Sequence, residues 1–120
     1  MAIDPRAFAR TLVRLNVVYT AIKAKTTSRA LTRDVGGEGL SFLADAPLEL
    51  GEQVKAELSL PDRAEAISFT GEVTRCTAAP ETTGSETAAH LIVVKFVMID
   101  PKQLSMIQQY VRLNALPLEG

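Results

Sequence analysis

Hydrophobic and polar residues alternate along the middle of the chain, and this period of two predicts β-strands that each bury one face. The alternation is clearest over residues 53–60, where one side of the predicted strand consists of Val54, Ala56, Leu58 and Leu60. Polar and charged residues occupy the positions between them. We therefore expect this segment to place one face on a hydrophobic core and the other in water.

Five further segments show less regular versions of this pattern, and residues typical of turns separate them. The predicted strands in these segments cover residues 15–25, 29–33, 40–43, 67–73 and 91–97. Turns are expected at residues 26–28, 47–51 and 61–62. Small and polar residues dominate positions 77–89, which are expected to form a mobile hairpin loop.

The last part of the chain has the periodicity of a helix. Leu104, Ile107 and Val111 fall on one stripe at helical spacing. Asp100 and Pro101 stand just before this stripe, and an acid at the N-cap followed by a proline is typical of a helix start. The sequence therefore predicts one C-terminal helix with a buried apolar face.

The first residues of the chain leave two structures open. Asp4 is followed by a proline, which again favours a helix start. Residues 5–13 fit either a short helix or an extended arm. In a helix, Arg6, Arg10 and Arg14 would share one face.

The order of predicted elements defines the expected architecture. Because no strand is followed by a helical crossover, the strands should pair antiparallel. Short strands with frequent turns favour a small barrel, and the helix would cover one open end or edge. We expect a mainly β fold, a small six-stranded antiparallel β-barrel with a C-terminal α-helix over residues 15–116, after a short N-terminal arm at residues 1–14.

Composition is consistent with one domain that has a single core, because the chain has 120 residues of which 47% are hydrophobic. Cys76 is the only cysteine, so no internal disulfide can form and a reducing compartment fits. The N-terminus does not resemble a signal peptide, and no apolar stretch is long enough to span a bilayer. These features predict a cytoplasmic protein without membrane insertion.

Charge is distributed unevenly along the chain, although the net charge is only −1. Residues 1–33 contain seven basic side chains and one acidic side chain, whereas residues 34–120 contain six basic and thirteen acidic ones. Such asymmetry suggests an anionic partner for the basic part. The alternative is that the basic residues form an ordinary solvated face.

Two arginines four residues apart, Arg10 and Arg14, lie just before the first predicted barrel strand. Guanidinium groups bind phosphate bidentately, and they also bind the O6 and N7 atoms of guanine. The spacing alone is weak evidence, because Arg6 with Arg10 and Arg29 with Arg33 have it too. Only its position in the chain singles out the pair Arg10 and Arg14.

Asp34 begins a glycine-rich segment that contains Gly36, Gly37 and Gly39. A carboxylate is a natural acceptor for the N1–H and N2–H₂ groups of guanine, and glycines allow a ligand to approach the backbone closely. The alternative is a tight turn between two strands, in which Asp and Gly serve only the turn geometry.

Taken together, the two signatures resemble those of the PilZ domain family. The family has the pattern RxxxR before its first strand and (D/N)xSxxG before a later strand. Arg10 and Arg14 match the first pattern, and Asp34 and Gly39 match the second. Gly36 stands where the family has a serine. The similarity continues through the middle strands and the final helix, over residues 10–111.

The resemblance implies a receptor for cyclic di-GMP that is not an enzyme and needs no cofactor besides this ligand. The receptor would change conformation on binding and signal in trans to an unidentified protein partner, with motility, adhesion and polysaccharide export machinery all open. The family's arginines clamp phosphates and guanines, and its Asp and Ser recognise a guanine edge. The expected ligand-binding residues are Arg10, Arg14, Asp34, Gly36, Gly37 and Gly39.

Two other functions remain open from the sequence. Since Gly36 has no hydroxyl, the chain could be a degenerate PilZ domain that binds no cyclic di-GMP and acts as a protein–protein interaction module. Binding to a nucleic acid polymer is less favoured, because aromatic residues make up only 5% of the chain. His90 and Cys76 lack the neighbours that a metal site or a catalytic triad needs, so we expect neither.

Overall fold

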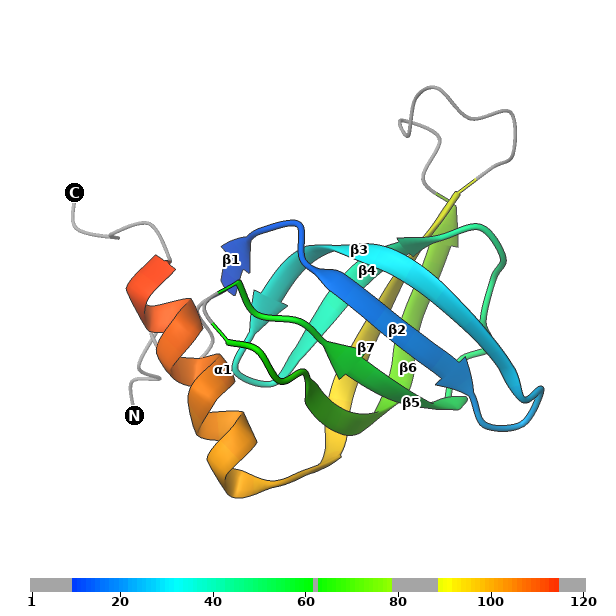
Figure 1. Ribbon diagram of the computed structural model, residues 1–120. Helices are drawn as coiled ribbons and strands as arrows, with labels where there is room; N and C mark the ends of the chain where they lie inside the picture. Colours follow the sequence, from blue (N-terminus) through cyan, green and yellow to red (C-terminus); the bar gives the residue numbers. More distant parts are fainter. Residues whose placement is uncertain (1–9, 62, 79–88, 115–120) are drawn as a thin grey trace, which may run out of the picture.

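All strand pairings in the described part of the chain are antiparallel, and they close on themselves to form a barrel (Figure 1). The computed structural model describes residues 10–61, 63–78 and 89–114. Six strands form the barrel: β2 (Asn16–Ala21), β3 (Thr26–Gly36), β4 (Gly39–Ala44), β5 (Gln53–Leu58), β6 (Ile67–Ala78) and β7 (His90–Ile99). Their order around the barrel is β2-β5-β6-β7-β4-β3, and β3 pairs back onto β2. The predicted six-stranded antiparallel barrel is confirmed.

A seventh strand, β1 (Arg10–Leu12), adds to the edge of β3. Residues 10–12 are therefore extended, and the helix that we left open for residues 5–13 is wrong for this part of it. The reason is that β3 offers backbone partners which a short isolated helix lacks. Residues 5–9, with Arg6 among them, lie outside the described residues.

The hairpin between β2 and β3 differs from the sequence prediction. Residues 26–28 were expected to form a turn, but they are the first residues of β3, and the turn occupies residues 22–25. Lys25 adopts a positive φ of 60°, and its N–H donates to the carbonyl of Ala21 at 2.7 Å. Threonine fits a strand as well as a turn, and Thr27 pairs across the hairpin with Thr20, their hydroxyl oxygens 2.8 Å apart.

Burial follows the predicted alternation closely. In β5 the side chains of Val54, Ala56 and Leu58 are buried and the residues between them are exposed. Tyr19 and Phe42 meet across the core with ring centroids 4.6 Å apart. Besides these, the largest fully buried hydrophobic side chains are Leu40, Ile67, Ile92, Ile107, Val17, Val35, Val73 and Val94. Of the predicted loop at residues 77–89, positions 77 and 78 belong to β6, and residues 79–88 lie outside the described part.

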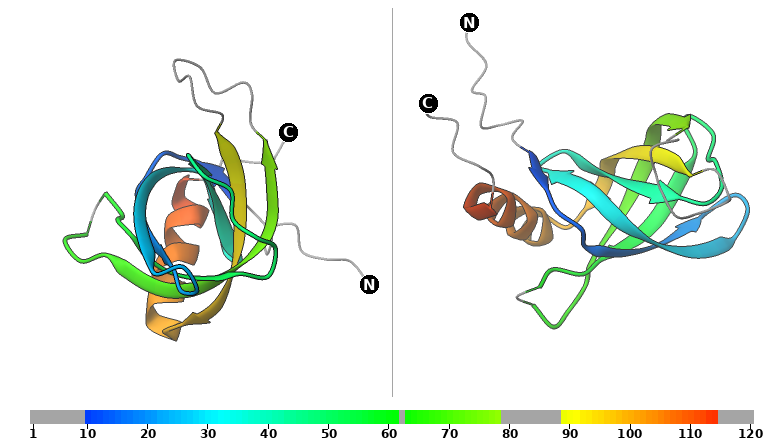
Figure 2. Two further views of the ribbon diagram at one scale, coloured as in Figure 1. Left: turned by 90° about the vertical axis from the view of Figure 1, so that its right-hand side faces the viewer. Right: turned by 90° about the horizontal axis from the view of Figure 1, so that it is seen from above.

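The helix α1 (Pro101–Asn114) lies across one end of the barrel, as Figure 2 shows. Asp100 caps it, because its carboxylate accepts a hydrogen bond from the backbone N–H of Lys102 at 2.8 Å. Ile107 and Val111 are buried and belong to the core, as their helical spacing predicted. The helix contacts β3 and β1, so it closes the end of the barrel at which β1 lies.

The cap of α1 gives a prediction about stability. Replacing Asp100 by alanine removes the acceptor for an N–H group at the start of the helix, which should cost about 1 kcal/mol of folding free energy. For a domain of this size the melting temperature should fall by about 3–5 °C. Glu65→Ala, at an exposed residue away from any helix end, is the control. Equal melting temperatures for the two variants would contradict the capping role.

Candidate functional site

The pairing of β1 with β3 brings the two sequence signatures together. Arg10 lies opposite Gly36, and Leu12 lies opposite Asp34. Residues that pair directly on antiparallel strands lie about 4.5–5.5 Å apart between their Cα atoms. The backbones of the arginine signature and of the Asp–Gly signature, which are separate in the chain, therefore lie on neighbouring strands. The sequence predicted both signatures but not this pairing.

The two faces of this strand pair have different environments. Thr11 and Val35 pair with each other and are 6% and 0% exposed, so their face is directed into the core. The other face contains Leu12, which is 81% exposed, and Asp34, which is half-buried. Asp34, a site residue of β3, is thus on the outside of the barrel and partly accessible to a ligand.

Arg14 lies in the connection between β1 and β2, where the chain forms no strand pairing with β3. The side chain of Thr32 fixes the backbone of this connection. The buried Thr32 hydroxyl donates to the carbonyl of Val13 at 2.5 Å and accepts from the N–H of Leu15 at 2.8 Å. The N–H of Val13 donates to the carbonyl of Arg33 at 3.1 Å. The backbone on both sides of Arg14 is therefore fixed, while the Arg14 side chain is exposed.

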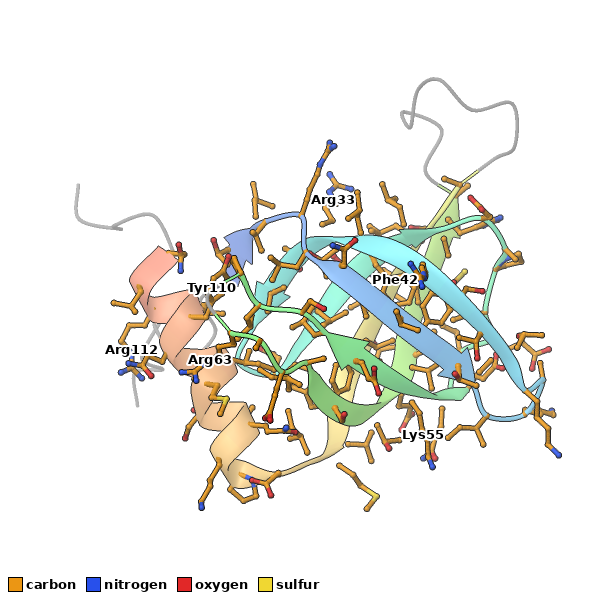
Figure 3. The ribbon with its side chains drawn as sticks, viewed as in Figure 1. Arg33, Phe42, Lys55, Arg63, Tyr110 and Arg112 are labelled. Atoms are coloured by element: carbon orange, nitrogen blue, oxygen red, sulfur yellow. The ribbon has the colours of Figure 1, made fainter. Side chains whose placement is uncertain are left out.

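Arg33 is a second exposed basic residue at this place, and sequence position alone did not select it. The pairing of β3 with β4 shifts register between Thr32 and Asp34, so Arg33 sits at a β-bulge. Figure 3 shows its side chain projecting away from the barrel. Arg14 and Arg33 thus expose two basic side chains where the chain leaves β3, and Asp34 follows Arg33 in the strand; basic groups of this kind suit a ligand that carries phosphate.

The three glycines of the second signature have different structural roles. Gly36 is buried at the end of β3, and Gly37 lies in the two-residue connection to β4. Gly39 is the first residue of β4, and a Cβ atom there would overlap the carbonyl oxygen of Val94 and lie 2.9 Å from the Cα atom of Lys95. Gly39 is therefore required for the close approach of β4 to β7, whatever its part in binding.

Other kinds of site find no support in the described residues. Residues 10–61, 63–78 and 89–114 contain no group of three His, Cys, Asp or Glu side chains that could hold a metal ion. Within the same residues, α1 is neither long nor apolar enough to cross a membrane, and no other helix occurs.

Comparison with known families and structures supports the same fold. The family model of the PilZ domain matches residues 4–113. The structure of the Bacillus subtilis inhibitor of motility MotI (DgrA) superposes with a TM-score of 0.76 at 19% identity, over 92% of this chain and 51% of that one. The PilZ domain of Escherichia coli YcgR with c-di-GMP gives a TM-score of 0.70 at 12% identity, and 92% of each chain is covered.

Apo MrkH from Klebsiella pneumonia gives a TM-score of 0.73 at 17% identity, over 95% of this chain and 52% of that one. The present chain thus spans about half the length of the Bacillus and Klebsiella proteins. The comparison with curated proteins finds no match. At these identities the structural matches establish the fold alone.

The role of Thr32 can be tested by removing only its hydroxyl. Thr32→Val leaves a carbonyl and an N–H group without their partner, so we expect a loss of about 2–4 kcal/mol in the free energy of unfolding, measured with urea. Thr32→Ser keeps the hydroxyl and removes one methyl group, which should cost only about 1 kcal/mol. Equal losses in the two variants would show that packing, and not the hydrogen bonds, makes Thr32 important.

Proposed function

Because this chain belongs to the PilZ domain family, whose members are non-catalytic receptors for cyclic di-GMP, we propose that it binds cyclic di-GMP and signals to a partner protein in trans. The observation that supports this most is the pairing of β1 with β3, which sets Arg10 opposite Gly36 and Leu12 opposite Asp34. The pairing supports the proposal because it puts the backbone of the arginine signature next to the residue whose carboxylate would accept hydrogen bonds from the ligand.

Each residue of the proposed site has a distinct task. Arg10 and Arg14 bind the phosphates and stack on or hydrogen-bond the guanines of the ligand. The Asp34 carboxylate accepts hydrogen bonds from guanine N1–H and N2–H₂. Gly36 and Gly37 have no side chains that would keep a base away from the backbone at the end of β3.

Gly36 departs from the family pattern, and the size of the missing interaction decides what this means. One neutral hydrogen bond contributes about 0.5–1.5 kcal/mol, or roughly up to tenfold in affinity. A bidentate arginine–phosphate contact contributes more. The substitution should therefore weaken binding of cyclic di-GMP without abolishing it.

A second function, a protein-interaction module that needs no nucleotide, is favoured by exposed apolar side chains near the same site. Leu12 is 81% exposed and Leu113 is 75% exposed. Their neighbours Thr11 and Asn114 touch, because the Thr11 hydroxyl donates to the Asn114 carbonyl at 3.3 Å. Each leucine is next in sequence to a residue of this contact, so β1 and the end of α1 each expose one apolar side chain beside it in the chain. The partner would belong to motility, adhesion or polysaccharide export machinery, and the B. subtilis match is itself named an inhibitor of motility.

Calorimetric titration with cyclic di-GMP tests the receptor function directly. We expect a dissociation constant in the micromolar range or tighter for the intact chain. Arg14→Ala should weaken binding by at least about tenfold, because it removes a charge-assisted contact to phosphate. The matched control is Arg29→Ala, since Arg29 is also an exposed arginine but pairs with Val18 in the hairpin away from the site.

The same titration separates the two functions. Binding that is lost in Arg14→Ala and kept in Arg29→Ala supports the receptor. If the folded intact chain gives no heat with cyclic di-GMP, GMP or cyclic di-AMP, the receptor function is wrong and the interaction module takes its place.

We also expect ligand binding to order the start of the chain. Residues 10–12 pair with β3, and residues 5–9 lie outside the described residues. Amide hydrogen exchange of residues 5–14 should slow in the presence of saturating cyclic di-GMP, whereas exchange in β5 should not change. Identical exchange at residues 5–14 with and without bound ligand would contradict the conformational switch.

A further inference from the structure

Ser41, in the middle of β4, has a hydroxyl that is buried without a hydrogen-bond partner in the described structure. The residue is 2% exposed. Its neighbours Leu40 and Phe42 point into the core, at 0% and 1% exposure. Since successive side chains of a strand point to opposite faces, Ser41 is directed to the outer face of the barrel. A buried hydroxyl normally finds a partner, so this one requires an explanation.

The register of the sheet places Ser41 beside the proposed ligand site. Ser41 pairs with Asp34 of β3 on one side and with Val93 of β7 on the other. Paired residues have Cβ atoms about 4.5–5.5 Å apart. Gly36, two residues along β3 from Asp34, is about 7 Å from it. The hydroxyl of Ser41 is thus at least as close to the Asp34 carboxylate as a serine at position 36 would be.

The chemistry of guanine matches this pair of side chains. The Watson–Crick edge of guanine carries the O6 acceptor next to the N1–H and N2–H₂ donors. A carboxylate satisfies the two donors and leaves O6 without a partner. A hydroxyl beside the carboxylate supplies the missing donor. Asp34 and Ser41 together therefore complement the whole edge, whereas adenine presents an amino group at the position of O6.

We propose that Ser41 supplies the hydroxyl that Gly36 lacks, and that it donates a hydrogen bond to O6 of a guanine whose other edge groups bind Asp34. This inference rests on the proposed function, because it assigns a residue to the same cyclic di-GMP site. It makes Ser41 a determinant of the preference for guanine. The sequence signature did not select Ser41, since the hydroxyl comes from a neighbouring strand.

The unpaired state of the hydroxyl makes this contact favourable. In water a hydroxyl must give up its bonds to solvent before it can bind a ligand, so the net gain of a hydrogen bond is small. The Ser41 Oγ atom is already closed off from water and has no described partner. When a guanine displaces the side chains around this hydroxyl, only the guanine O6, and not the Ser41 hydroxyl, gives up a hydrogen bond to form the new one. For this reason we expect an effect at the upper end of the range for a neutral hydrogen bond, about tenfold.

The test is the titration of cyclic di-GMP into Ser41→Ala, with Ser105→Ala on the exposed face of α1 as the matched control. Ser41→Ala should weaken binding about tenfold and leave the melting temperature of the unliganded protein unchanged or higher, because it removes an unpaired buried polar group. Ser105→Ala should bind as the intact chain does. Cyclic di-IMP keeps O6 and N1–H but lacks the 2-amino group. Its affinity for Ser41→Ala should be lower than its affinity for the intact chain by the same factor as for cyclic di-GMP.

Each remaining outcome counts against the inference in a distinguishable way. Equal affinity of Ser41→Ala and Ser105→Ala, with the intact chain binding, would overturn the role of Ser41 and leave the receptor function standing. A lower melting temperature together with weaker binding would show a structural role. A loss for cyclic di-GMP but none for cyclic di-IMP would exclude O6 as the acceptor. No binding by the intact chain would overturn both the receptor function and this inference.

Discussion

The structure depends on the backbone pairing of one long strand, β3, with three other strands. Its first half pairs with β2, and its second half pairs with β4 on one edge and with β1 on the other. This pairing closes the barrel and leaves no long free edge. Asp34 lies in the part of β3 that pairs with a neighbouring strand on both sides, whereas Gly36 pairs with β1 alone. Asp34 is therefore held by backbone pairing on both edges of its strand, and its backbone position is set before any ligand arrives.

Several residues at the site serve the fold and the proposed binding at once. Thr32 satisfies two backbone groups that would otherwise be unpaired, and in doing so it sets where Arg14 leaves the sheet. Gly39 permits the close contact of β4 with β7, although its place in the second signature suggests a ligand-binding residue. A glycine in a binding signature is thus not by itself evidence of a ligand contact. The requirement at Gly39 holds for a receptor and for an interaction module alike.

The sequence predicted the strands and the helix, but it could not predict which distant residues the fold brings together. Period-two alternation identified the barrel strands, because each strand buries one face, and the chemistry of Asp100 identified the start of α1. The turn expected at residues 26–28 was wrong because threonine is common in both turns and strands. The pairing of Arg10 with Gly36 could not be predicted, since it joins distant segments. The same is true of Ser41, whose significance comes from register and burial, neither of which is a local property of the sequence.

The short strand β1 contacts the candidate site and the helix α1. It pairs along its backbone with β3, and the side chain of its middle residue contacts the helix. Arg10 and Leu12 are paired with the site residues of β3, whereas Thr11 between them is buried and donates its hydroxyl hydrogen bond to the last residue of α1. A strand of three residues makes too few hydrogen bonds to be stable alone. The position of β1 therefore depends both on its pairing with β3 and on its contact with α1. Any displacement of β1 by a bound ligand must then alter its contact with Asn114 at the end of α1. A receptor without catalytic residues needs such a mechanical connection, because its only output is a changed surface.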